Sequence, residues 1–423
     1  MDIDIKSLHT VTLDPDKCKG CVTCMKRCPT EAIRVRNGKA KVLYERCIGC
    51  GECIRLCPHH AKKASYDPFD TIYNYKYRIA LPAPSLYGQF NNLTDINYVL
   101  NGLLEIGFDD VFEVGRGAEL ISAASKILLD KGHIRKPVIS TACPAVLELI
   151  MVRYKHLLPH LLNLLAPVDI VAKLAREKAL SQGIPAEDIG IFFISPCPAK
   201  VYALKSGLGV KKPLVEGVLA VSDVYLRLLS AMSSLKPEQI KPISKLGVEG
   251  MQWASSGGEA AALYRDKYLA ADGVENVNNV LKALEDNTLR DVEFIELNAC
   301  ISGCVGGVLN IENPFIAKAR LRGLRKRLPN GKCNTLADQG KSLDYYMWEK
   351  EPDFKDVYKL DEDRLAALNK LIEIDKILEG LPLIDCGECG APSCRAFSED
   401  LVNGEIPPDT KCPKVIDESA KNS

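Results

Sequence analysis

The sequence lacks the features that mark membrane proteins, secreted proteins and nucleic-acid-binding proteins. No uninterrupted apolar run approaches the ~20 residues that a membrane-spanning helix needs. The 55 basic and 55 acidic residues cancel, so net charge gives no sign of a nucleic acid or an anionic membrane as partner. The chain opens with the acidic residues Met1-Asp2-Ile3-Asp4 and not with a signal peptide. We therefore expect a cytoplasmic protein with no nucleic-acid partner and no membrane insertion.

Cysteine, in contrast, is abundant. The chain has 17 cysteines in 423 residues, and all except Cys333 fall into four sets of four. Disulfides on this scale belong to small secreted domains, whereas this chain is long enough for one sizeable core and two small appendages. The cysteines are therefore expected to be metal ligands, and Cys333 an incidental thiol.

The first eight cysteines form two copies of the pattern CxxCxxCxxxCP, which is the run of a bacterial two-cluster ferredoxin. In that run three close thiolates bind one [4Fe-4S] cluster and the fourth cysteine reaches the other cluster. We predict one cluster on Cys18, Cys21, Cys24 and Cys57, and a second on Cys47, Cys50, Cys53 and Cys28, in a small α+β domain over residues 1–65. The alternative is a pair of zinc sites, but zinc gives no reason for a repeated third cysteine followed by proline.

The middle of the chain alternates short apolar runs with amphipathic segments, which is typical of an α/β domain with a mainly parallel sheet. The aromatic, proline-bearing residues 66–77 are expected to be a linker. The expected strands are residues 77–81, 111–114, 137–140, 189–194 and 292–297. The expected helices are residues 95–106, 118–129, 168–179 and 222–232.

Three of the expected strands end in a cysteine: Cys143, Cys197 and Cys300. Ligands of open α/β sheets gather beyond the carboxyl ends of the strands, so these thiols can converge from distant positions. Cys304 completes a set of four, and the glycines around it allow backbone to approach a bulky cluster closely. The alternative is that these are buried structural cysteines, which are common in apolar strands.

The segments that carry these cysteines resemble the three signature loops of the iron-only ([FeFe]) hydrogenases. They read Ser-Thr-Ala-Cys-Pro at 140–144, Ser-Pro-Cys-Pro-Ala-Lys at 195–200 and Ala-Cys-Ile-Ser-Gly-Cys-Val-Gly-Gly at 299–307. The resemblance covers about residues 77–325, and a ferredoxin module ahead of this domain is usual in the family. It implies an α/β hydrogenase-like core with mainly parallel sheets.

The resemblance also implies a cofactor of the H-cluster type. In the family the four cysteines hold a [4Fe-4S] cluster, and the last of them bridges it to a diiron unit that carries CO, cyanide and an azadithiolate. Here these ligands would be Cys143, Cys197, Cys300 and the bridging Cys304. Family members contact the cyanides through an Ala-Pro-Ser turn and a lysine, which this chain has as Ala83, Pro84, Ser85 and Lys200.

The chain departs from the catalytic members of the family at several positions. Ala142 stands where those enzymes have a cysteine that passes protons to the diiron unit, and a methyl group is unable to relay a proton. On the preceding helix only Glu119, or an ordered water chain, is left to substitute. Two methionines near the diiron unit correspond here to Ser195 and Asn298, so the redox poise should differ.

A fourth cysteine set follows the hydrogenase-like domain: Cys386, Cys389, Cys394 and Cys412. The motif resembles the small [4Fe-4S] domain of corrinoid iron-sulfur proteins, and an extra motif of this kind is typical of the sensory branch of the hydrogenase family. We expect a helical connector over residues 326–380 and this third [4Fe-4S] domain over residues 381–423. A zinc knuckle with similar spacing is the alternative.

Two segments are candidate docking surfaces for a partner, which would be a ferredoxin-like electron donor or acceptor or a separate signalling output protein. They are residues 361–378 and the basic residues 317–328, and each is also explained as an ordinary packed or solvated helix.

The sequence thus predicts a hydrogenase-like redox protein with slow reversible H2 oxidation and proton reduction. It would sense H2 or redox state and relay electrons through its iron-sulfur clusters. Two alternatives stay open at this stage: an iron-sulfur electron carrier or scaffold with no diiron site, and a reductase subunit that uses the pocket for another substrate. Retained Ser85 and Lys200 favour the hydrogenase reading, and Ala142 favours the alternatives.

Overall fold

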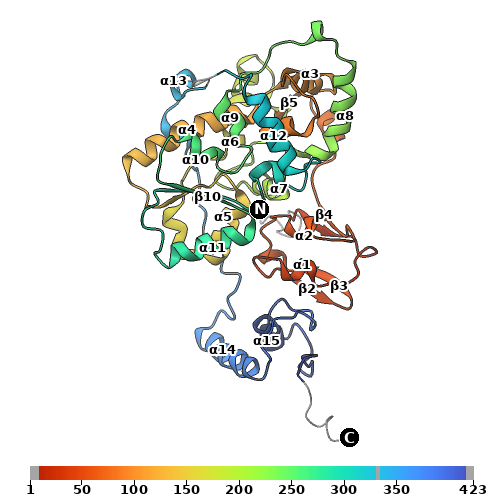
Figure 1. Ribbon diagram of the computed structural model, residues 1–423, viewed down its shortest axis with the longest axis vertical. Helices are drawn as coiled ribbons and strands as arrows, with labels where there is room; N and C mark the ends of the chain where they lie inside the picture. The colour runs from red at the N-terminus through yellow and green to blue at the C-terminus, as the bar shows by residue number, and fades with distance from the viewer. Residues whose placement is uncertain (1–8, 330–333, 416–423) are drawn as a thin grey trace, which may run out of the picture. The chain divides into compact units, whose positions relative to one another are not determined.

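The computed structural model describes residues 9–329 and 334–415, and Cys333 lies outside them (Figure 1). The chain forms two compact units. The first, which we call the cysteine unit, comprises Met1–Ile48, Glu52–Lys63 and Phe354–Ser423. The second, the core unit, comprises Gly49–Gly51 and Ala64–Asp353.

The core unit contains two parallel sheets. The larger has the strand order β6-β5-β8-β9, and the smaller has the order β10-β11-β7. Every strand pair described in these two sheets is parallel. The strands are β5 (Tyr77–Pro82), β6 (Asp110–Val111), β7 (Val138–Ile139), β8 (Ile189–Ser195), β9 (Gly217–Ala220), β10 (Tyr268–Asp272) and β11 (Phe294–Asn298).

Strand β8 shows why the larger sheet is sandwiched between helices. All seven of its residues are buried, as expected for a central parallel strand that is covered on both faces. Its side chains alternate between two apolar clusters, with Phe192 and Ile194 in one and Ile191 and Phe193 in the other. This alternation follows from the two-residue period of a strand.

Helices fill both clusters. Apolar residues of α3, α8 and α12 pack in the cluster with Phe192, and residues of α6 pack in the cluster with Phe193. Figure 1 shows α3, α8 and α12 together beside β5. The helices of the core unit are α3 (Asn97–Glu105), α4 (Val114–Lys131), α5 (Pro144–Arg153), α6 (Pro167–Ser181), α7 (Pro198–Ser206), α8 (Val221–Ser234), α9 (Val248–Gln252), α10 (Gly258–Ala262), α11 (Val274–Glu285), α12 (Pro314–Arg325) and α13 (Leu336–Gln339).

The predicted fold class, an α/β core with mainly parallel sheets, is confirmed, but some of its elements differ from expectation. The strand expected at residues 111–114 ends at Val111, because Val114 already begins α4. Strands β9 and β10 had no counterpart in the sequence prediction. The segment expected as a linker contains a 3-10 helix, Phe69–Asn74, and its Phe69 and Ile72 are buried in the core, so this segment is packed structure.

The cysteine unit contains short elements around its thiols. Strands β1 (Val11–Leu13) and β4 (Lys62–Ala64) pair, and β2 (Ile33–Arg36) forms an antiparallel hairpin with β3 (Lys39–Val42). Asn37 and Gly38 both have positive φ, as the two-residue turn of such a hairpin requires. The helices of this unit are α1 (Thr23–Lys26), α2 (Glu52–Arg55), α14 (Arg364–Glu379) and α15 (Cys394–Val402).

Candidate active site and metal centres

The cysteines of the core unit follow the carboxyl ends of its strands. Cys143 comes after β7 and is the N-cap of α5, while Cys197 comes after β8 and is the N-cap of α7. A proline occupies the first turn of both helices, where its missing N–H is not needed. Cys300 directly follows Ala299 at the end of β11, so all three strand-end cysteines belong to parallel sheets whose ends carry ligands in many folds.

The structure brings most of this set into electrostatic contact. The charges of Cys304 and Cys143 both act on Cys197, and burial raises the pKa of the Cys197 thiol to about 11. Cys300 is linked to Cys304 through a tight turn, in which the Gly303 N–H donates to the Cys300 carbonyl at 3.0 Å. Each of these four cysteines is half-buried and outside any disulfide.

Glycines around Cys304 allow a close approach that no other residue permits. Gly303 has φ +82°, and a Cβ on it would lie 2.5 Å from the Ser256 nitrogen. A Cβ on Gly307 would lie 2.2 Å from the Pro196 carbonyl oxygen. The third loop therefore packs directly onto the second loop and onto residues 255–256 by backbone contact.

Lys200 lies beside this set. Its Nζ lies 3.5 Å from the Cys304 Sγ. Burial opposes the charged form, but the neighbouring Cys304, Cys197 and Cys143 outweigh it, so the pKa of Lys200 is raised. The ammonium is thus held permanently charged beside the sulfur.

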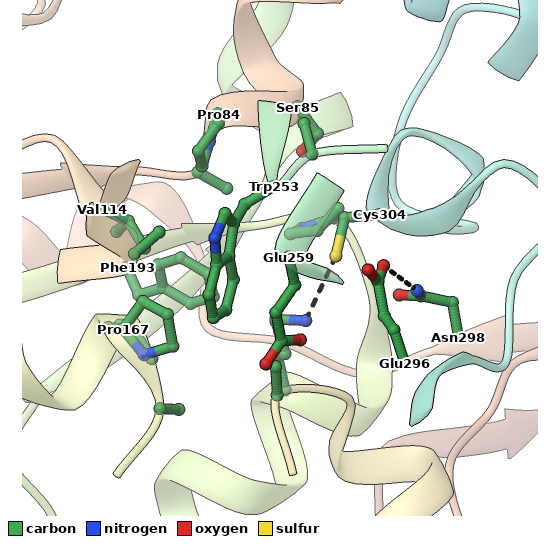
Figure 2. Close-up of a pocket in the computed structure, with 18 residues that line it drawn as sticks. Pro84, Ser85, Val114, Pro167, Phe193, Trp253, Glu259, Glu296, Asn298 and Cys304 are labelled. Atoms are coloured by element: carbon green, nitrogen blue, oxygen red, sulfur yellow. Dashed lines mark hydrogen bonds between the residues drawn. The ribbon is translucent and has the colours of Figure 1, made fainter. Parts of the chain in front are cut away.

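A cavity of about 70 Å³ lies next to Cys304 (Figure 2). On this scale one water molecule needs roughly 10–15 Å³, so the cavity has room for a group larger than a single water. Its wall is mostly apolar. It includes five of the non-cysteine residues that the sequence singled out: Ala83, Pro84, Ser85, Ala142 and Lys200.

Ser85 is an unusual member of this wall. Its side chain is fully buried, and its Oγ has no hydrogen-bond partner among the described residues. A buried hydroxyl left without a partner costs roughly 1–3 kcal/mol, so it indicates a ligand that accepts its hydrogen bond. Ser85 and the Lys200 ammonium together offer two hydrogen-bond donors in the wall of this cavity to an anionic or strongly accepting group.

Two buried carboxyl groups, Glu259 and Glu296, also line the cavity and were missed by the sequence analysis. Burial, reinforced by the charge of Glu296, raises the pKa of Glu259 to about 8. Burial likewise raises the pKa of Glu296, whose carboxylate accepts from the N–H groups of Gly257 and Ala260 at 2.9 Å. The available signal was a glutamate inside the apolar strand β11, since charged residues are rarely buried without a reason.

Glu259 connects to the first signature loop. The Ser140 hydroxyl donates to Glu259 Oε2 at 2.6 Å, and the Ala142 N–H donates to the same Ser140 Oγ at 3.2 Å. A protonatable carboxyl is therefore linked through the Ser140 hydroxyl to the backbone of Ala142.

Glu119, the substitute relay that the sequence suggested, has other partners. Its Oε1 accepts from the N–H of Gly247 at 2.7 Å and of Gly250 at 3.3 Å, and its Oε2 accepts from Asn334 at 2.5 Å. Glu119 is not part of the cavity wall. Its carboxyl anchors the start of α9 and leaves no oxygen directed at the cavity.

The two polar replacements of the family's methionines differ in exposure to the cavity. The Ser195 hydroxyl donates to the Cys197 carbonyl at 3.0 Å and accepts from the Cys197 N–H at 3.3 Å, so it shapes the second loop. Asn298 lines the cavity, and its amide donates to Glu296 Oε1 at 2.8 Å (Figure 2).

Several of the ferredoxin-type cysteines lie close to one another. The charges of Cys21, Cys57 and Cys18 act on Cys24, and all four of these cysteines line one small cavity. The charges of Cys47 and Cys28 act on Cys53. Cys50 belongs to the segment Gly49–Gly51, which groups with the core unit.

The C-terminal cysteines also approach one another. The charges of Cys412 and Cys386 act on Cys389, and Cys394 begins α15 with Ser393 as its N-cap. No group of three His, Cys, Asp or Glu residues in the described ranges converges on a position for a single metal ion. Within those ranges no helix is both long and apolar enough to cross a membrane.

Three family matches cover most of the chain. The family described as "Iron only hydrogenase large subunit, C-terminal domain" matches residues 76–268 and 222–308. The family described as "4Fe-4S dicluster domain" matches residues 10–58, and the Fe-S cluster family named FeS matches residues 381–413.

Solved [FeFe]-hydrogenase structures share the fold. A structure concerned with oxygen inactivation of an [FeFe]-hydrogenase matches with a TM-score of 0.52 at 14% identity, over 67% of this chain and 95% of that chain. A variant of HydA1 from Chlamydomonas reinhardtii matches with a TM-score of 0.51 at 15% identity, over 67% and 95% of the two chains. HydA(deltaEFG), from a study of H-cluster assembly, matches with a TM-score of 0.51 at 15% identity, over 69% and 97%. The hydrogenase family match covers more than half of the residues, and the chain therefore belongs to the iron-only hydrogenase family, with a ferredoxin-like domain before its hydrogenase domain and an Fe-S domain after it.

Proposed function

We propose that this protein carries out slow, reversible H2 oxidation and proton reduction at an H-cluster-type site, and that it serves to sense H2 or cellular redox state. Cys143, Cys197, Cys300 and Cys304 would hold the [4Fe-4S] part of that site. The diiron part, with its CO, cyanide and azadithiolate ligands, would occupy the cavity beside Cys304. When bound, it would supply the chemistry that splits H2 into protons and electrons.

The observation that carries this proposal is the pair of donors, Ser85 and Lys200, on the cavity wall. The Ser85 hydroxyl is buried and has no hydrogen-bond partner among the described residues, and the Lys200 Nζ lies 3.5 Å from the Cys304 Sγ. Cyanide is an anionic acceptor, so it fits both donors and removes the cost of leaving the hydroxyl unpaired. The mostly apolar remainder of the wall suits CO and excludes water.

The slow rate follows from Ala142. This residue lines the cavity where the family's catalytic members have a thiol, and its methyl group has no proton to give. A positioned acid or base contributes roughly 10²–10⁴-fold to a rate, so its loss costs about that much unless another group takes over.

Glu259 is the group that partly takes over. With its pKa near 8, its buried carboxyl holds a proton at neutral pH and can release one with little change in conditions. The Glu259 carboxyl itself lines the cavity, and the Ser140 hydroxyl donates to its Oε2 and so fixes the orientation of the carboxyl. The proton supply of the site would thus run through this carboxyl in place of a thiol.

Electrons would leave or enter through the ferredoxin clusters on Cys18, Cys21, Cys24 and Cys57 and on Cys47, Cys50, Cys53 and Cys28. The C-terminal cluster on Cys386, Cys389, Cys394 and Cys412 would be a third station. The acceptor would be a ferredoxin-like redox protein or a separate signalling protein. A low turnover rate suits a sensor, because a sensor needs to reach redox equilibrium with H2 and does not need a high flux of electrons.

The second candidate is an iron-sulfur electron carrier that has no diiron unit, which Ala142 favours because such a protein needs no proton relay. An H2-uptake assay with an artificial electron acceptor distinguishes the two candidate functions. The assay compares protein that is loaded with [4Fe-4S] clusters alone with protein that is additionally matured with the diiron precursor. We expect slow uptake in the matured sample only. Equal results in both samples would overturn the proposal and leave the carrier.

A further inference from the structure

The two halves of the ferredoxin module repeat each other in structure as well as in sequence. Residues 28–33 read Cys-Pro-Thr-Glu-Ala-Ile, and residues 57–62 read Cys-Pro-His-His-Ala-Lys. The fourth residue of each segment has positive φ, 51° at Glu31 and 49° at His60. The alanine N–H then donates to the cysteine sulfur, at 3.2 Å in the first half and 3.3 Å in the second.

The repeat breaks at its last position. Ile33 is 2% exposed in the first half, and its counterpart in the second half is Lys62, which is 3% exposed. A lysine thus occupies a site that its repeat partner shows to be suited to an apolar side chain. Lysine is almost never fully buried unless its charge is compensated.

No side chain compensates this charge within the described residues. The Lys62 Nζ is buried and has no hydrogen-bond partner there. Leaving a buried ammonium unpaired costs several kcal/mol, so its presence points to a nearby anionic group. A [4Fe-4S] cluster with four thiolate ligands is such a group.

The surroundings of Lys62 identify which cluster it serves. Lys62 lines the small cavity that Cys18, Cys21, Cys24 and Cys57 enclose. Among charged groups, Lys62 acts most strongly on Cys24, whereas at Cys53 of the other set it ranks behind Cys47. The charge of Lys62 thus acts on cysteines of both sets, and its place in the wall of this cavity assigns it to the first cluster.

We propose that Lys62 supplies a buried positive charge that makes the cluster on Cys18, Cys21, Cys24 and Cys57 the more easily reduced of the two ferredoxin clusters. Reduction adds one electron, and hence one negative charge, to a cluster that is already anionic. No ligand or proton need change. A positive charge in a water-poor site stabilises that added charge strongly, and it stabilises the nearer cluster more than the farther one. Electrons entering the module would collect on the first cluster.

This role depends only on the ferredoxin clusters and holds whether or not the core unit carries a diiron group. It also gives electron transfer through the ferredoxin module a direction. Two clusters of equal potential would share an electron evenly, whereas Lys62 biases the electron towards one side. Ile33 provides no such bias at the equivalent position near the other cluster.

The test is a redox titration of the full-length, cluster-loaded protein with dithionite, followed by low-temperature electron paramagnetic resonance. The ferredoxin pair is recognised by the magnetic interaction that appears once both of its clusters are reduced. One of the two ferredoxin clusters is reduced first, and we expect Lys62→Met to lower its midpoint potential. The expected decrease is at least about 59 mV, which for one electron corresponds to a tenfold change in the equilibrium constant of reduction. The midpoint potential of the other ferredoxin cluster should change less, so the gap between the two midpoint potentials should narrow.

Lys63→Met is the matched control, because Lys63 is the next residue of β4 but is exposed and pairs with Asp14. Water screens its charge, so both potentials should stay near their wild-type values. Lys62→Gln keeps a polar side chain and repeats the measurement if the methionine variant loads fewer clusters by iron count. The proposal is overturned if both Lys62 variants leave the gap unchanged, or if Lys63→Met narrows it equally.

Discussion

Arg34 of β2 and Asp400 of α15 form a buried ion pair that joins the ferredoxin module to the C-terminal cysteine domain. The Arg34 Nε lies 2.7 Å from one carboxylate oxygen of Asp400 and 3.1 Å from the other. Arg36 binds the same carboxylate, and both partners of the Arg34 pair are less than a tenth exposed. Beside this pair, the Val35 N–H donates to the Gly390 carbonyl at 2.8 Å. The two cluster-bearing segments of the cysteine unit are therefore fastened together although more than 300 residues separate them in the chain.

Asp400→Asn should release the C-terminal domain from β2. The substitution leaves the Arg34 guanidinium buried without its counter-charge, at a cost of about 3–5 kcal/mol. That corresponds to roughly 10²-fold or more in the docking equilibrium. Hydrogen exchange at the Val35 amide measures this, because docking protects that amide.

Asp375→Asn controls for the loss of a carboxylate. Asp375 pairs with Arg395 at 3.7 Å with both side chains about half exposed, so this pair contributes less than about 1 kcal/mol. Val35 exchange should stay at the wild-type rate in this variant. An unchanged rate in Asp400→Asn would show that Arg34 and Asp400 do not hold the segments together.

Ala142→Cys should raise H2 turnover of the fully matured protein. The thiol would restore a proton donor and acceptor at the cavity wall, a contribution of about 10²–10⁴-fold. Ala142→Ser is a control of similar size, since an aliphatic hydroxyl is a much weaker acid than a thiol. A gain that is equal in both variants, or absent from both, would mean that proton transfer at this position does not limit the rate.

Glu259→Gln should slow turnover by about 10²-fold and remove a pH dependence centred near 8. In the wild-type protein the carboxyl loses its proton as the pH rises through about 8, so proton reduction should fall above that pH. The amide does not titrate, so the variant should show no inflection there. Glu285→Gln, at an exposed site at the end of α11, should behave as wild type.

The same pKa shift affects stability in a defined direction. Because burial raises the pKa of Glu259 above its ordinary value of 4.5, the native state binds more protons than the unfolded state between about pH 4.5 and 8. The free energy of unfolding should therefore fall as pH rises through this window, by up to about 1.4 kcal/mol per pH unit. Thermal unfolding at several pH values should show a flatter dependence for Glu259→Gln, and an identical slope would contradict the assigned shift.

Ser85→Ala should be nearly neutral for the fold but should disturb the bound cofactor. It removes a buried hydroxyl that has no hydrogen-bond partner in the described part of the chain, so the apoprotein should lose no stability or become slightly more stable. In the matured protein it should shift one cyanide stretching band in the infrared spectrum. Ser195→Ala is the comparison, because that hydroxyl is satisfied by Cys197 and should leave the cyanide bands in place.

The cysteine ligand sets could be proposed from the sequence because their spacing is local or follows strand ends. The proposed roles of Glu259 and Lys62 could not, because each depends on partners brought close by folding. Glu259 meets Ser140 across 119 positions of sequence. Lys62 carried a weak signal as a lysine at a repeat position that is apolar in the other half, but its burial was needed to interpret that signal.

Glu119 is the opposite case. The sequence suggested this residue as a substitute proton relay, whereas in the structure its carboxyl binds other partners. It lies on the helix where the family's proton path runs, yet two backbone N–H groups and Asn334 occupy its oxygens. Those partners come from residues 247–250 and 334, far along the chain. Helical position alone predicts which face a residue is on, and the partners on that face decide what the residue does.

Infrared spectroscopy of anaerobic protein matured with the diiron precursor tests the central claim most directly. The donors Ser85 and Lys200 and the cavity beside Cys304 lead us to expect CO and cyanide stretching bands that shift when H2 replaces an inert gas. Protein in which all [4Fe-4S] clusters are intact by iron count, but which shows no such bands or bands that ignore H2, would contradict the proposed hydrogenase-type site.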